Sequence, residues 1–149
     1  MINLLKNIFS TQTTDEEKDD IKKLELLCGL MIEAAYTDGQ ISDSELGKIR
    51  LSLINIFEED PNKVNVALDE AINNKDNSKS LYHYTSYINK NFTDDKKLLL
   101  IEAMWEIVLS DGKVHDYESN LIRRLAGLLY ISDINSGNAR KRALDKNKN

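Results

Sequence analysis

Apolar residues recur at spacings of three and four positions along most of the chain, which is the period of a helix with one buried face. One proline, Pro61, and six glycines interrupt these stretches, and strands have almost no support in the pattern. The chain is therefore predicted to be all-α, a single domain of about seven helices. The predicted helices cover residues 16–37, 43–57, 61–74, 79–90, 94–110, 116–130 and 133–145.

Residues that suit a helix N-terminus stand at several of these starts. The side-chain oxygens of Asp, Ser and Thr accept hydrogen bonds from the free backbone N–H groups of the first helical turn. A serine with a glutamate three positions later makes a reciprocal capping box. We expect caps at Asp60, Thr93 and Ser132, and a capping box between Ser42 and Glu45.

The ends of the chain differ from its middle. The sequence predicts a short amphipathic segment and polar linker over residues 1–14, a helical domain over residues 15–146, and a disordered tail over residues 147–149. The first apolar run is too short for a signal peptide, and no stretch of about 18 uninterrupted apolar residues predicts a transmembrane segment. These features predict a cytoplasmic protein.

Two acidic turns of the chain have similar sequences. The sequence "TDGQISDSE", residues 37–45, returns as "SDGKVHDYE", residues 110–118, at an offset of 73 positions. With their flanks, both copies fit the pattern E-x4-D-G-x-[IV]-x-D-x-E-x3-I-R. The pattern predicts a duplicated helix-turn-helix-helix unit, with the helix at 79–90 added between the copies.

The acids of this pattern are the candidate site residues. Their spacing matches the second half of an EF-hand calcium loop, in which a glutamate closes the loop. Apolar residues and a tyrosine stand where that loop has its first two acidic ligands, so neither copy forms the cage alone. Two further glutamates lie in helices that are apolar nearly all round, where a carboxylate is costly unless a cation pairs with it. The predicted divalent-metal ligands, for calcium or magnesium, are Asp38, Glu45, Asp111 and Glu118, with Glu33 and Glu106 behind them.

Two other interpretations of these acids stay open. In the first, Glu33 pairs with Arg50 and Glu106 pairs with Arg123, the acidic turns need no metal, and the protein is a helical scaffold. In the second, the acids hold a metal that activates water, and the protein is a metal-dependent hydrolase. The hydrolase is the weaker interpretation, since no nucleophile has an evident base near it in the sequence.

The composition limits the classes of partner that the protein is expected to bind. The formal net charge is −5, which disfavours a phosphate-binding surface and nucleic acid as a partner. The single cysteine, Cys28, lies among apolar residues and is expected to be a buried, inert thiol. Trp105 and Met104 are expected in the core and not in a ligand pocket.

The stretches "AAYTDGQISDSE" and "VLSDGKVHDYESNLIRRLAGLL" resemble the tellurite-resistance protein B family, or TerB-like domains, which also occur in certain membrane-anchored DnaJ-type cochaperones. The resemblance implies an all-helical domain that binds a divalent metal at two D-G turns and has no established reaction. Asp38, Glu45, Asp111 and Glu118 match the family motif best. It also implies a non-enzymatic interaction component of a tellurite-type stress response, with an unidentified protein partner in a membrane-associated complex peripheral to the inner membrane.

Overall fold

The computed structural model describes residues 15–36, 40–74, 80–110 and 116–147, and these form seven helices and no strand. The predicted all-α class is therefore confirmed for the part of the chain that the structure describes. Each predicted helix is present, and its ends differ from the prediction by two residues at most. The helices are α2 (Asp15–Ala35), α3 (Asp43–Asn55), α4 (Pro61–Asn73), α5 (Leu81–Asn91), α6 (Asp94–Val108), α7 (Asp116–Leu128) and α8 (Asp133–Asn147).

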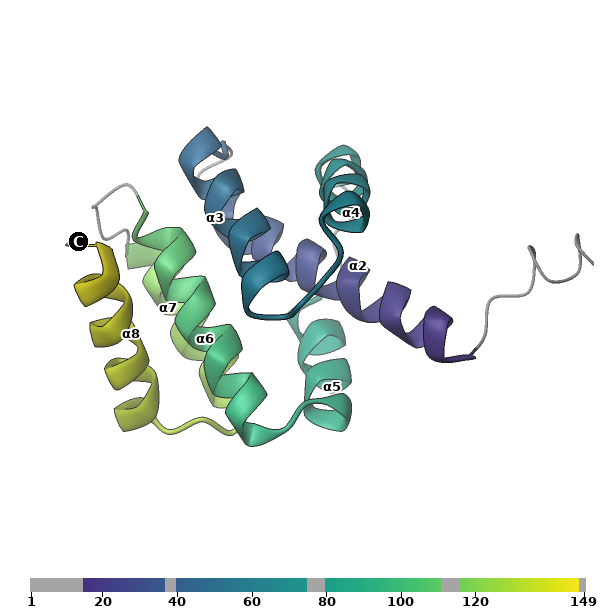
Figure 1. The fold of residues 1–149 in the computed structure, drawn as a ribbon. Helices are drawn as coiled ribbons and strands as arrows, with labels where there is room; N and C mark the ends of the chain where they lie inside the picture. The colour runs from purple at the N-terminus through teal and green to yellow at the C-terminus, as the bar shows by residue number, and fades with distance from the viewer. Residues whose placement is uncertain (1–14, 37–39, 75–79, 111–115, 148–149) are drawn as a thin grey trace, which may run out of the picture.

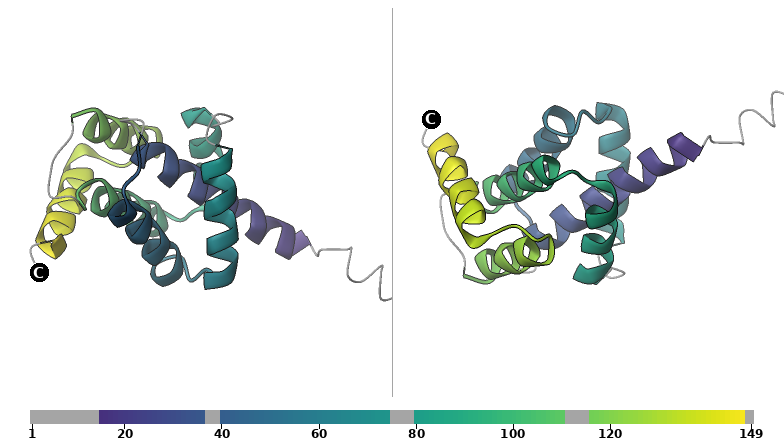
Figure 2. Two further views of the ribbon diagram at one scale, coloured as in Figure 1. Left: turned by 90° about the horizontal axis from the view of Figure 1, so that it is seen from above. Right: turned by 90° about the horizontal axis from the view of Figure 1, so that it is seen from below.

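Helices α2 and α6 form the centre of the molecule. Helix α6 packs against α2, α3, α7 and α8, and helix α2 packs against α3, α4, α5, α6 and α7 (Figures 1 and 2). In α6 the buried side chains point in all directions from the helix axis, as the near-continuous apolar sequence predicts. Burial of Trp105 and Met104, at 1% and 0% exposure, confirms that both belong to the core.

The predicted caps are present and explain where the helices begin. Ser42 Oγ accepts from the backbone N–H of Glu45 at 3.1 Å, and the glutamate in turn accepts from Ser42, which completes the capping box. Asp60, Thr93 and Ser132 each accept a hydrogen bond from the backbone N–H three residues later. Each such cap stabilises its helix by about 1 kcal/mol.

The two halves of the described chain follow the same plan. Helix α3 spans Asp43–Asn55 and α7 spans Asp116–Leu128, so both ends recur 73 positions later, and the end of α2 recurs at the end of α6. In each half the first helix packs on the second and third, and the second packs on the third. These bounds agree with a duplicated unit, although descent of the two halves from one ancestral unit stays a prediction.

Candidate functional site

Glu33 lies near the end of α2 and has a carboxylate oxygen without a partner among the described residues. Its Oε2 is buried, and no described residue donates a hydrogen bond to it or forms an ion pair with it. Burial raises the pKa of this carboxyl above its ordinary value, because the charged form has lost part of its hydration. A buried carboxylate oxygen that accepts nothing is a position where a cation would lower the energy.

Glu106, the counterpart of Glu33 in α6, has a cation beside it. Lys146 Nζ of α8 lies 2.8 Å from Glu106 Oε1, and this contact raises the pKa of the lysine. The same ammonium lies 3.6 Å from Oε1 of Glu102, one turn earlier on α6. Arg142 Nε donates to that Glu102 oxygen at 3.1 Å. Ion pairs between two glutamates of α6 and two cationic side chains of α8 thus join these helices.

Glu45 and Glu118 occupy matching places in the first turns of α3 and α7. Glu45 is half-buried, and its Oε1 lies 3.0 Å from Ser42 Oγ in the capping box. Glu118 is 3% exposed, so its carboxyl is far more enclosed than that of a solvated helix start. A negative charge in the first turn also suits the helix dipole. Both helices begin at the upper end of the view in Figure 1.

The predicted metal site falls partly outside the described residues. Asp38 and Asp111 lie in segments 37–39 and 111–115, which the structure does not describe. Among described residues, no group of three or more His, Cys, Asp and Glu side chains is placed to hold a metal ion. The four glutamates therefore do not form a site by themselves, and metal binding stays a prediction that depends on the two aspartates.

Neither ion pair of the scaffold interpretation is present among the described residues. Glu106 pairs with Lys146 and not with Arg123, and Glu33 forms no pair with Arg50. Arg123 lies instead beside Trp105, in a pocket described below. The sequence prediction failed here because helix α8 is polar on most of its surface, and its pattern does not reveal which residues face α6.

The two halves differ in the charges that face these glutamates. Asn73 stands 73 positions before Lys146, and Asp69 stands 73 positions before Arg142. The first half therefore has no cation at either place that pairs with a glutamate in the second half. Glu33 is left with a buried acceptor, whereas Glu106 is neutralised.

Comparison with known proteins gives one family. The model of the family described as Tellurite resistance protein TerB matches residues 24–141, which is most of the chain. Comparisons with curated proteins and with solved structures found no match. Within the described residues, no helix is long and apolar enough to cross a membrane.

Proposed function

Because the chain belongs to the tellurite resistance protein TerB family, we propose that it is a non-enzymatic helical module that binds one divalent cation at its first acidic turn and engages a protein partner. The cation is calcium or magnesium, since the available donors are carboxylates and hard cations prefer oxygen ligands. The partner is a component of a stress response of the kind that the family description names.

The buried, unpartnered oxygen of Glu33 is the observation that carries this proposal. At the matching position Glu106 has the ammonium of Lys146 at 2.8 Å, and the sequence of the first half supplies no such lysine. A divalent cation would provide for Glu33 the positive charge that Lys146 provides for Glu106. The donors that would hold it are Glu33, Asp38 and Glu45.

A cation bound at this site would fix the arrangement of the helices on either side of the first acidic turn. Glu33 belongs to the end of α2 and Glu45 to the start of α3, so a shared ion would tie these two helices together. A partner that contacts this end of the domain would then distinguish the ion-bound protein from the ion-free protein. This coupling is what a cation-dependent interaction module requires.

Thermal unfolding of chelator-stripped protein tests the proposal, with calcium, magnesium or manganese added separately. One site filled at about a hundred times its dissociation constant stabilises the fold by roughly 2.7 kcal/mol, or about 5 to 10 °C. We expect Glu33→Gln to abolish that rise and the matched variant Glu106→Gln to retain it. The absence of any rise up to millimolar ion, or an equal loss in both variants, would refute the first-turn site.

A metal-free helical interaction module is the second candidate, and two contacts favour it. Glu45 already serves the capping box with Ser42, and Glu106 already pairs with Lys146, so neither carboxylate needs an ion. This candidate predicts that partner binding is the same in chelator and in calcium. A pull-down with the natural partner from lysate, performed in both buffers and with Glu33→Gln as bait, separates the two candidates.

A further inference from the structure

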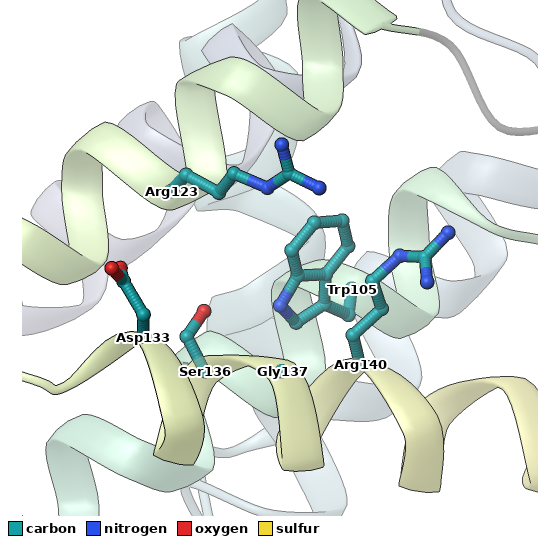
Figure 3. A pocket seen from close by; sticks show the side chains of 6 residues that line it. All are labelled: Trp105, Arg123, Asp133, Ser136, Gly137 and Arg140. Atoms are coloured by element: carbon teal, nitrogen blue, oxygen red, sulfur yellow. The ribbon is translucent and has the colours of Figure 1, made fainter.

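A pocket of about 420 Å³ lies in the second half of the chain, between α6, α7 and α8. The close view in Figure 3 shows the side chains that surround it, with Arg123 and Arg140 on two sides of the indole ring. Its volume falls in the range of small-molecule sites. The lining residues are Trp105, Arg123, Asp133, Ser136, Gly137 and Arg140.

Three polar groups of this pocket have no hydrogen-bond partner in the part of the chain that the structure describes. They are the indole Nε1 of Trp105, the hydroxyl of Ser136 and Nε of Arg140, and all three are buried. The side chains of Trp105 and Ser136 are 1% and 4% exposed. An indole N–H and a guanidinium can only donate, so what the pocket lacks is hydrogen-bond acceptors.

The side chains that line the pocket carry a net positive charge, which favours a negatively charged ligand. Arg123 is exposed and forms no ion pair with a described residue, and the Arg140 guanidinium carbon lies 5.6 Å from the centre of the Trp105 ring. Against these two cations stands one carboxylate, Asp133, which Figure 3 places on the far side of Ser136 from Arg140. The local balance is therefore positive although the whole chain has a net charge of −5.

We propose that this pocket binds the phosphate group of a small phosphate monoester or of a lipid headgroup. A phosphate monoester has three terminal oxygens and carries between one and two negative charges at neutral pH, which matches a set of several convergent donors and two guanidinium groups. Guanidinium groups bind phosphate through paired hydrogen bonds, and such charge-assisted bonds are about twice as strong as neutral ones.

The buried donors that line this pocket have no equivalents at the matching positions of the first half. At the 73-residue offset, Ile32 stands for Trp105, Lys63 for Ser136 and Ala67 for Arg140. Among the lining residues, Arg123 and Asp133 have counterparts of their own kind, Arg50 and Asp60. The same fold plan thus exists without the buried donors, so the fold does not require them. Their presence without acceptors indicates a ligand and is independent of the proposed cation site.

Fluorescence of Trp105, the only tryptophan of the chain, reports binding directly. The probe is inorganic phosphate at constant ionic strength, with sodium chloride as the blank. We expect a saturable change, and we expect Arg123→Gln to weaken the affinity at least about tenfold because a charge-assisted hydrogen bond is lost. The neighbouring Arg124→Gln removes an exposed arginine that does not line the pocket and should leave the affinity unchanged.

Sedimentation with phosphatidylcholine vesicles, with and without phosphatidic acid, distinguishes the two sources of the phosphate. Selective binding to phosphatidic acid that Arg123→Gln removes indicates a lipid headgroup, whereas a response to inorganic phosphate alone indicates a soluble ligand. Ser136→Ala, which removes a buried hydroxyl and leaves the rim charges, should weaken binding of whichever probe responds. No response of the native protein to either probe, or equal affinity in Arg123→Gln and Arg124→Gln, would overturn the proposal.

Discussion

Gly29 provides a sharp test of the packing between α2 and α5. It lies in the interior of α2, where glycine is destabilising relative to alanine by roughly 0.5 to 1 kcal/mol. A Cβ atom built at this position would lie 2.9 Å from Tyr84 Oη and 3.3 Å from its Cε1. Tyr84 is 4% exposed in α5, so its ring has little room to move away.

The two effects of Gly29→Ala have opposite signs, and the packing effect is the larger. Overpacking a filled core costs typically 1 to 3 kcal/mol, against a gain in helix propensity of about 1 kcal/mol at most. We therefore expect a net loss of about 0.5 to 2 kcal/mol, or a fall in Tm of roughly 1 to 8 °C for a domain of this size.

Urea and thermal denaturation followed by circular dichroism measure this difference. Gly47→Ala is the matched control, because Gly47 lies in α3 and a Cβ atom there meets nothing within 4 Å. The control should gain about 0.5 to 1 kcal/mol. Tyr84→Phe removes the atom that approaches Gly29 most closely, so it should cost less in the Gly29→Ala background than alone. A stabilised Gly29→Ala protein would refute the reasoning.

Three further predictions concern single side chains. Ser42→Ala removes the capping box of α3 and should cost about 1 kcal/mol in urea denaturation, whereas an unchanged midpoint would show that the cap is unimportant. Burial, with nearby Glu59 and Glu25, raises the pKa of the Cys28 thiol to about 12, so a thiol reagent should label it only after unfolding. The pKa of Glu33 is raised in the folded state, so the protonated carboxyl favours folding and the ionised carboxyl opposes it. The contribution of the protonated form to stability is therefore lost as pH rises through the folded pKa. Without added ion, Glu33→Gln should therefore be more stable than the native protein at neutral pH. Denaturation at several pH values should show this difference in stability shrinking as the pH falls. A difference that stays constant with pH would contradict a raised pKa of Glu33.

Much of the fold could be predicted because its signals are local. The apolar sequence of α6 indicates a helix buried on all sides, and the caps at Ser42, Asp60 and Thr93 each depend on residues at most three positions apart. Local signals of this kind do not depend on how distant helices meet. The family resemblance rests on the same short stretches, and the family match over residues 24–141 confirms it.

The charges around the glutamates could not be predicted for a physical reason. The contact between Glu106 and Lys146 joins residues 40 positions apart, and it depends on the rotation of α8 about its own axis. The sequence of α8 has a weak apolar face, so its pattern leaves that rotation open. An ion pair predicted from proximity in a repeat unit, Glu106 with Arg123, was therefore wrong.

The pocket was missed because its members have ordinary separate explanations. Trp105 in an apolar helix is expected in the core, and it is there. Only the packing of α8 on α6 shows that its indole N–H and the hydroxyl of Ser136 are buried together without acceptors. The net charge of −5 does not reveal this pocket either, since two arginines line it in an acidic protein.

The number of calcium ions bound per chain tests the central claim most directly. Isothermal titration calorimetry on chelator-stripped protein should give one ion per chain, because Glu33 has a buried acceptor free of cations and Glu106 has Lys146 beside it. Glu33→Gln should bind none, and Lys146→Met should expose a second site by freeing Glu106. Two ions in the native protein, or one ion retained by Glu33→Gln, would contradict the account.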